Sequence, residues 1–109
     1  MSCSRGEGEE KISYKPHVVH VAGTNKGNVF LFALSTCAWC RRTKALLTQL
    51  DVAYDYVDVD QLEGEARTQA TSELKAINPS QAFPTMLVNG EPLIGFQEER
   101  LRELFDDEY

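Results

Sequence analysis

Two cysteines three residues apart, Cys37 and Cys40, are the residues of this chain best suited to covalent chemistry. They flank the dipeptide Ala38-Trp39, at the point where an apolar run gives way to a helical pattern. Residues at positions i and i+3 of a helix lie on one face about 5–6 Å apart, so the two thiols could form and break a disulfide without unfolding the chain. The spacing therefore predicts a redox-active cysteine pair.

The two cysteines are expected to have different roles. A cysteine that enters a helix faces unpaired backbone N–H groups and the positive end of the helix dipole, and both favour the thiolate. Cys37 is therefore the expected nucleophile, and Cys40, one turn deeper, is the expected resolving thiol. Arg41, Arg42 and Lys44 follow directly, and their positive charges should favour the thiolate further. For Arg41 we give equal weight to the alternative that it is a solvent-exposed helix residue with no effect on the thiolate.

Length and composition fit one compact domain. The chain has 109 residues, 42% of them hydrophobic and 26% charged, with a formal net charge of -6. It has no apolar stretch of roughly 18–20 residues and no signal-peptide pattern at its start, so we expect a cytoplasmic protein. In a reducing cytosol a close cysteine pair is more often catalytic or metal-binding than structural. The acidic balance argues against nucleic acid as a partner, and we expect a monomer with no membrane contact.

The N-terminal segment differs in composition from the rest of the chain. Residues 1–14 contain many glycine, glutamate and polar residues, so we expect a disordered tail, followed by one domain over residues 15–109. Cys3 lies in this tail and is interpreted as an incidental thiol.

Alternating apolar and helical segments predict an α/β domain. Residues 17–22 and 28–34 are β-prone and are joined by glycine-rich turn chemistry, which predicts an antiparallel pair. Residues 38–50 predict a helix with Ser35 or Thr36 as its N-cap. The remaining segments are a strand over residues 52–59, a helix over 63–77, a hairpin of strands over 84–88 and 92–94, and a helix over 97–105.

In the strand predicted over residues 52–59 the alternation of apolar and polar residues is irregular, because it shifts by one position between Tyr56 and Val57. Such a shift fits either a strand buried on both faces or a β-bulge. Asp55, Asp58 and Asp60 lie in and after this strand, and we interpret them as solvated residues rather than as an acid/base cluster.

Two segments carry a resemblance to a known family. They are Cys37-Ala-Trp-Cys-Arg-Arg-Thr-Lys-Ala-Leu-Leu47 and Phe83-Pro-Thr-Met-Leu-Val-Asn-Gly-Glu-Pro-Leu-Ile-Gly95. Both are similar to the signature segments of glutaredoxins and glutaredoxin-like proteins, and the likeness extends over roughly residues 28–107. It implies a thioredoxin fold, βαβαββα with a central mixed sheet flanked by helices, here after an extra N-terminal strand. The implied activity is that of a dithiol electron carrier, a thiol–disulfide oxidoreductase.

The resemblance also implies which residues surround the catalytic pair Cys37 and Cys40. The Phe83-Pro84 peptide is expected to be cis and to lie against the Cys37 sulfur, leaving the Phe83 backbone free to pair with an extended substrate. Trp39 is favoured as an exposed recognition residue over a packing residue. The expected substrate-binding residues are Thr36, Ala38, Trp39, Phe83, Pro84, Gly95 and Phe96.

The expected substrates are disulfide-bearing proteins, but the sequence leaves the electron donor open. Glutathione-binding members typically carry a lysine before the first cysteine, a proline after it, and a second glycine after the hairpin, where this chain has Thr36, Ala38 and Phe96. Without this lysine, the glutathione carboxylates lose a charge-assisted hydrogen-bond partner worth on the order of 1.5–3 kcal/mol. Other groups could hold an anion: Arg42, Lys44, Gln81 or the start of the last helix. Glutathione and a thioredoxin-reductase-type enzyme are both possible donors, and we expect no bound cofactor.

Metal binding is the alternative function. His17 and His20 together with the cysteine pair have the composition of a structural zinc site. If residues 17–22 form a strand, however, the two histidines project to opposite faces and cannot both reach one ion. In relatives the first cysteine can bridge an iron–sulfur cluster between two monomers, which this sequence neither requires nor excludes for Cys37.

Overall fold

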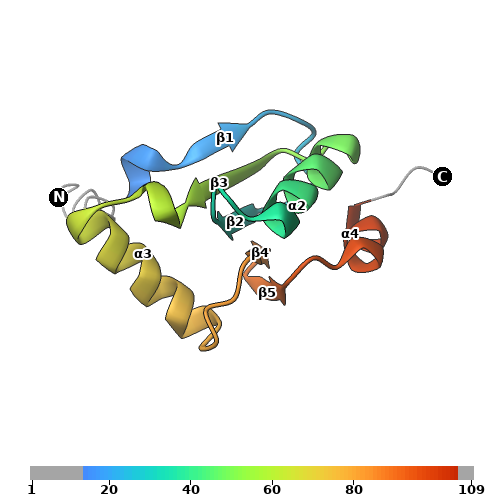
Figure 1. Cartoon of the computed structure of the whole chain (residues 1–109). Coiled ribbons are helices and arrows are strands. Elements are labelled where there is room, and N and C mark those ends of the chain that lie inside the picture. Colours follow the sequence, from blue (N-terminus) through green and yellow to red (C-terminus); the bar gives the residue numbers. More distant parts are fainter. Residues whose placement is uncertain (1–13, 106–109) are drawn as a thin grey trace, which may run out of the picture.

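A computed structural model describes residues 14–105 and shows a five-stranded mixed sheet with helices on both faces (Figure 1). The strands are β1 (Val19–Val21), β2 (Val29–Ala33), β3 (Tyr54–Asp58), β4 (Thr85–Val88) and β5 (Glu91–Ile94). The helices are α2 (Ala38–Gln49), α3 (Gly64–Ile77) and α4 (Glu98–Phe105), with short 3₁₀ turns η1 (Lys15–His17) and η2 (Val59–Gln61). This order confirms the predicted βαβαββα arrangement after an extra strand. Each helix of the described part is too short or too polar to span a bilayer.

The first strand does not have the predicted partner. The sheet order is β1-β3-β2-β4-β5, so β1 pairs antiparallel with β3, while β2 lies between β3 and β4. The segment predicted as a hairpin turn instead passes the start of β3, where the Thr24 N–H donates to the Asp51 carbonyl and the Ala53 N–H donates to the Thr24 carbonyl, both at 2.9 Å. The predicted pairing is wrong because both edges of β2 are occupied by other strands.

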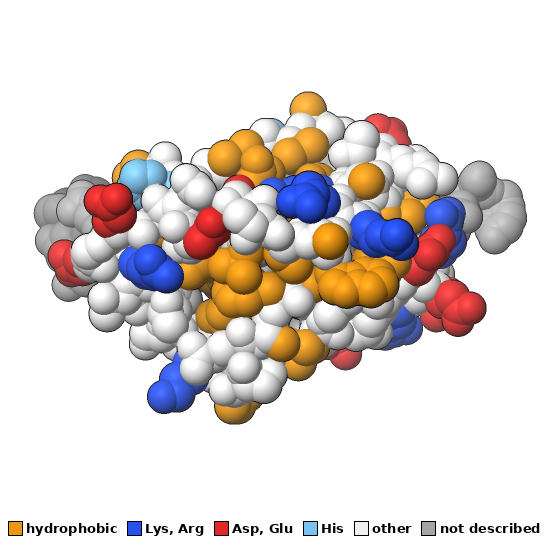
Figure 2. Space-filling model, viewed as in Figure 1, with side chains coloured by type: hydrophobic (Ala, Val, Ile, Leu, Met, Phe, Trp, Pro, Cys, Tyr) orange, Lys and Arg blue, Asp and Glu red, His pale blue; other side chains and the backbone are white. Residues whose placement is uncertain are grey.

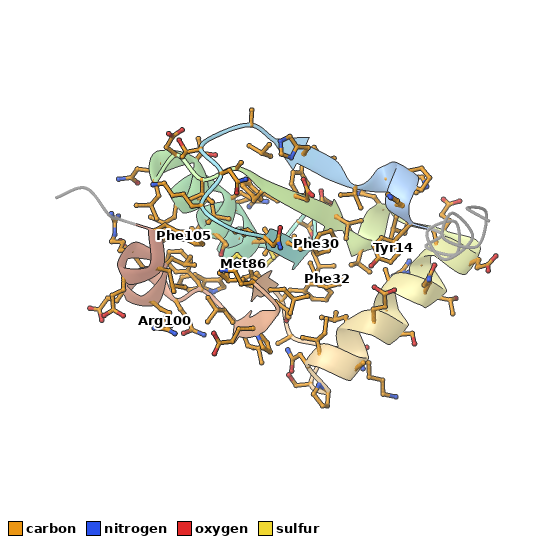
Figure 3. All side chains as sticks on the ribbon, turned by 180° about the vertical axis from the view of Figure 1, so that it is seen from behind. Tyr14, Phe30, Phe32, Met86, Arg100 and Phe105 are labelled. Carbon is orange, nitrogen blue, oxygen red and sulfur yellow. The ribbon has the colours of Figure 1, made fainter. Side chains whose placement is uncertain are left out.

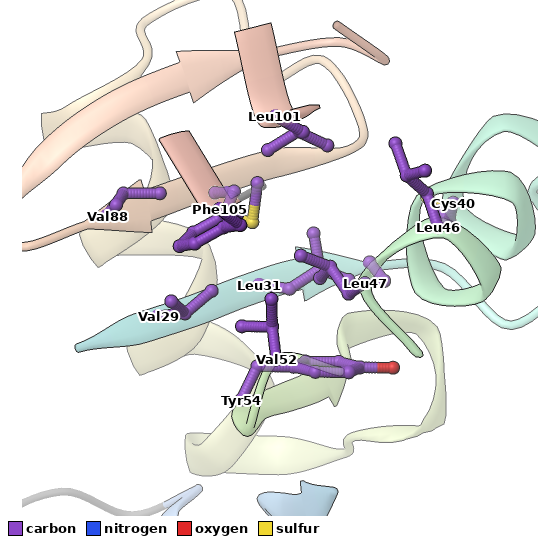
Figure 4. Packing of buried hydrophobic residues seen from close by; sticks show 12 residues of the cluster. Val29, Leu31, Cys40, Leu46, Leu47, Val52, Tyr54, Val88, Leu101 and Phe105 are labelled. Atoms are coloured by element: carbon purple, nitrogen blue, oxygen red, sulfur yellow. The ribbon is translucent and has the colours of Figure 1, made fainter. Parts of the chain in front are cut away.

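Each face of the sheet has its own hydrophobic cluster. On one face α2 and α4 cover a cluster that includes Leu31, Leu47 and Phe105 (Figure 4). On the other face α3 covers Phe32 and its neighbours (Figure 3). Consecutive residues of β2 thus point to opposite clusters, as expected of a central strand covered on both sides.

The irregular apolar phase of β3 comes from burial on both faces and not from a bulge. Its parallel register with β2 is continuous, from Phe30 opposite Asp55 to Ala33 opposite Asp58. Val57 of the same strand belongs to the cluster under α3. Because β2 and β3 are parallel, their carboxyl ends lie at the same edge of the sheet, and the loops that follow them meet there.

Tyr14 belongs to the folded domain, although the sequence places it in the tail. Its side chain is 5% exposed and packs in the cluster that contains Phe32 and Val57 (Figure 3). Its hydroxyl donates a hydrogen bond to the Glu73 carboxylate of α3. Burial of the aromatic ring against α3 therefore fixes this residue. The rest of the predicted tail, residues 1–13 with Cys3, lies outside the described residues, as do residues 106–109.

Candidate active site

Cys37 lies at the start of α2, where the sequence places it, and is itself the N-cap of the helix. Its Sγ accepts a hydrogen bond from the Cys40 N–H at 3.2 Å, and its own N–H donates to the Leu34 carbonyl at 3.2 Å. The side chain is partly exposed. The prediction of Ser35 or Thr36 as the N-cap is wrong, because α2 begins at Ala38 and the cysteine thiol occupies the capping position.

Cys40 lies on the inner side of the same helical turn and is 0% exposed. Burial, and then a hydrogen bond with the Cys37 side chain, raise the pKa of the Cys40 thiol to about 12. Both cysteines are free thiols, so the structure is that of the dithiol form. A thiol with this pKa stays protonated near neutral pH, which fits the role predicted for the second cysteine.

Asp60 holds the loop that leads into Cys37. Its carboxylate accepts hydrogen bonds from the Ser35 N–H at 2.8 Å and from the Ser35 hydroxyl at 2.6 Å. The Gln61 side-chain amide donates to the same hydroxyl at 3.0 Å. The hydrogen bonds from Ser35 lower the pKa of the Asp60 carboxyl. The interpretation of Asp60 as a merely solvated residue is wrong, because η2 brings it to the loop after β2, and Ser35 is thereby occupied and cannot cap α2.

The cations that follow Cys40 have different surroundings. Lys44 is largely buried, with its Nζ 3.1 Å from the Asp58 carboxylate and 3.9 Å from the centre of the Tyr56 ring. Arg41 and Arg42 are exposed, and within residues 14–105 neither forms an ion pair with a carboxylate. The positive charge that remains available at the site is therefore that of the two arginines.

A cavity of about 260 Å³ opens beside the start of α2. It is lined by Trp39, Phe83, Pro84, Gly95 and Phe96, which are five of the seven predicted substrate-binding residues. The Phe83-Pro84 peptide bond is cis, as predicted. Trp39 is 54% exposed, and its ring centre lies 5.7 Å from that of Phe96. Two sequence segments that are more than forty residues apart thus form one apolar site, as the two matching motifs predict.

Buried hydrogen bonds that the sequence does not reveal fix the loop carrying Phe83 and Pro84. Asn78 is 3% exposed and Thr85 is 0% exposed. The Asn78 Nδ2 donates to the Thr85 hydroxyl at 3.1 Å, and this hydroxyl donates to the Ala82 carbonyl at 2.7 Å. In the sequence Asn78 only marks the end of a helix before a proline, so no local signal could have identified this support.

The family assignment follows from comparison with known proteins. The profile of the glutaredoxin family matches residues 29–93, which is more than half of the chain and includes Cys37, Cys40 and Pro84. The chain belongs to the glutaredoxin family. The predicted family and the predicted thioredoxin fold are both confirmed.

Solved structures and a curated relative agree with this assignment. The chain is 45% identical to the glutaredoxin from Methanosarcina mazei Go1, with a TM-score of 0.73 over 80% of this chain and 85% of that one. It is 41% identical to Methanosarcina acetivorans methanoredoxin, with a TM-score of 0.73 over 77% of this chain and 90% of that one. It is 22% identical, over 70% of its own length and 95% of the relative, to an uncharacterized glutaredoxin-like 8.6 kDa protein in the rubredoxin operon of Clostridium pasteurianum.

The other two predicted substrate-binding residues of this glutaredoxin-family chain, Thr36 and Ala38, lie on either side of Cys37. Both are exposed, and neither lines the cavity. Their contact with a substrate therefore stays a prediction.

The structure does not assemble the residues of the alternative zinc site. His17 lies in η1, and His20 lies in β1 with its Nδ1 2.7 Å from the Asp55 carboxylate. The cysteine pair lies at the start of α2. Over residues 14–105 there is no group of three or more histidine, cysteine, aspartate and glutamate side chains that could hold a metal ion.

Proposed function

We propose that this protein is a dithiol electron carrier that reduces protein disulfides or mixed disulfides through Cys37 and Cys40. The observation that supports this most strongly is the asymmetry of the thiol pair. Cys37 is partly exposed at the helix start, whereas Cys40 is fully buried directly behind it. Membership of the glutaredoxin family supports thiol oxidoreductase chemistry of this kind.

The proposed reaction has two exchange steps. In the first step the Cys37 thiolate attacks one sulfur of the substrate disulfide, that disulfide breaks, and the leaving sulfur takes up a proton. In the second step Cys40 loses its proton and attacks the Cys37 sulfur, which releases the second substrate thiol and leaves a Cys37–Cys40 disulfide. Two electrons pass from the protein to the substrate, so an outside thiol or reductase must return two electrons and two protons.

The start of α2 supplies the electrostatic support for these steps. The Cys40 N–H already donates to the Cys37 Sγ at 3.2 Å, and it would stabilise the negative charge on this sulfur when Cys37 is the thiolate or the leaving group. The two thiols carry both electrons, so the reaction needs no bound cofactor. We propose the cytoplasm as its place, because a reducing compartment keeps the dithiol form available.

A coupled assay tests the proposal and identifies the donor. The oxidised protein is supplied with glutathione, glutathione reductase and NADPH, or with a thioredoxin-reductase-type enzyme and NADPH, with insulin as the disulfide probe. Wild-type protein should reduce insulin with one of the two donors, and Cys37→Ser should reduce the rate to background. Cys3→Ser is the matched control and should leave the rate unchanged. Full activity of Cys37→Ser would show that the proposal is wrong.

A further inference from the structure

Arg42, Trp39 and Phe96 form a continuous stack beside Cys37. The Arg42 guanidinium carbon lies 5.2 Å from the centre of the Trp39 ring, and the Trp39 and Phe96 rings lie 5.7 Å apart with an interplanar angle of 30°. A guanidinium over an indole face is attracted by the ring quadrupole. The stack joins α2 to the loop after β5, so the exposed Trp39 ring is held in one orientation on the surface.

The cavity beside this stack is small and apolar. Its volume of about 260 Å³ lies below the range of roughly 300–1,000 Å³ that is typical of sites for drug-sized ligands. Its lining residues are four large apolar or ring-bearing side chains and one glycine, and no charged side chain is among them. An apolar side chain entering this cavity would lose its hydration without leaving a buried polar group unpaired.

Arg42 brings a positive charge next to the cavity by stacking on Trp39, although the chain as a whole is acidic and Glu98 and Glu99 follow Phe96 at the start of α4. The formal net charge is -6, yet α2 has no acidic residue in its first turn and presents Arg41 and Arg42 without a carboxylate partner among the described residues. Figure 2 shows hydrophobic side chains across the middle of one face of the molecule, with both basic and acidic side chains beside them. A carboxylate on a binding partner would complement the two arginines.

We propose that the stack of Arg42, Trp39 and Phe96, with the adjoining cavity, is a recognition surface that selects one class of protein disulfide. In this class the reacting cysteine has an apolar side chain next to it, which fills the cavity, and an acidic side chain close by, which faces the arginines. The inference rests on the proposed function and specifies its substrate. Glutathione contains no apolar side chain that could fill the cavity, so its disulfide should be a poorer substrate.

Four matched peptide disulfides test this proposal. Each is a symmetric disulfide of a short capped peptide that carries either Phe or Ser on one side of the cysteine and either Asp or Lys on the other. The rate constant for oxidation of the fully reduced protein is measured by chromatography of the released peptide thiol. It is divided by the rate constant with dithiothreitol, which corrects for the intrinsic reactivity of each disulfide. The Phe peptides should exceed the Ser peptides by about tenfold, and the Asp peptides should exceed the Lys peptides by about two- to fivefold.

Variants separate the two preferences. Arg42→Gln should reduce the preference for Asp over Lys and leave most of the preference for Phe, while Trp39→Ser should abolish the preference for Phe. Arg67→Gln, which removes an exposed arginine from α3 and not from α2, is the matched control and should change neither preference. High salt should weaken the preference for Asp and leave the preference for Phe intact, because salt screens exposed charges.

The outcomes distinguish this inference from the proposed function. Equal corrected rates for the four peptides, or faster reduction of glutathione disulfide than of every peptide, would overturn the recognition surface while leaving the oxidoreductase proposal in place. Wild-type preferences retained in Trp39→Ser would overturn it as well. If the reduced protein transfers electrons to none of the disulfides, the proposed function itself fails.

Discussion

The two sides of the first turn of α2 carry the same side chain in opposite surroundings. On the outer side Cys37 is partly exposed beside the aromatic cavity, and on the inner side Cys40 is fully buried between α2 and the sheet (Figure 4). Under the proposed function, this difference gives the two thiols different parts in one exchange reaction. The outer thiol would meet the substrate, and the inner thiol would stay protonated and shielded until a mixed disulfide had formed next to it.

Alkylation of the native protein gives the largest expected contrast between the two sides. At pH 7 iodoacetamide should label Cys37 at least about 10³ times faster than Cys40, because only a minute fraction of a thiol with a pKa of about 12 is ionised and the side chain is 0% exposed. Peptide mass spectrometry after timed quenching measures both rates. Equal labelling would mean that the inner thiol is neither shielded nor protonated.

Removal of the inner thiol should stop the second step and leave the first intact. Cys40→Ser should lower turnover of protein disulfides by about 10²-fold or more, because the mixed disulfide on Cys37 has no resolving partner. Nonreducing gel electrophoresis should show this mixed disulfide accumulating with the substrate. Unchanged turnover without such an adduct would contradict the assigned roles.

The burial of Cys40 should also appear in the pH dependence of stability. The folded-state pKa of about 12 lies above the ordinary value of 9.0, so above pH 9 the unfolded chain releases this proton while the folded protein retains it. The free energy of unfolding should therefore fall as pH rises above 9, by up to about 1.4 kcal/mol per pH unit from this group. Urea unfolding at pH 8, 9 and 10 measures the slope, which should be shallower in Cys40→Ala.

Identical slopes in the wild-type protein and Cys40→Ala would show that the inner thiol is not perturbed. Burial is the main cause that raises the pKa of Tyr54 above its ordinary value of 10.0. This tyrosine therefore adds its own pH dependence above pH 10, and the comparison is cleanest below that pH.

The smallest expected effect concerns the loop that leads to the outer thiol. Asp60→Asn removes the charge of the acceptor that binds both the N–H and the hydroxyl of Ser35. Alkylation of Cys37 should slow by about fivefold, comparable with the loss of one hydrogen bond of about 1 kcal/mol. Asp55→Asn is the control, since it affects an exposed pair with His20 on β1. An equal effect of both substitutions on the alkylation rate would contradict the positioning role of Asp60.

Local sequence patterns predict most elements of this fold but not all of their contacts. The predicted helices and strands agree with the observed ones to within about two residues, because periodicity and breakers such as Pro79 and Asn89-Gly90 act locally. The partner of β1 could not be predicted in this way, since it depends on which sheet edge is free. The same is true of Tyr14, whose burial depends on the distant α3.

In the candidate site, too, some features could be predicted from the sequence and others could not. The cysteine pair and the lining of the cavity could be predicted, because two motifs identify them in the sequence. The contacts between Asp60 and Ser35 and between Asn78 and Thr85 could not, because each joins polar residues whose pairing arises only when the chain has folded. The stack of Arg42 on Trp39 is intermediate, since the spacing of three residues permits it but does not require it.

A redox titration of the native protein tests the central claim most directly. The protein is equilibrated in dithiothreitol buffers of graded potential, quenched with acid and an alkylating agent, and analysed by peptide mass spectrometry. We predict one two-electron transition, in which a Cys37–Cys40 disulfide replaces the two labelled thiols and the ratio changes tenfold over about 30 mV. Two thiols that never interconvert at any potential would contradict the claim that this pair transfers electrons.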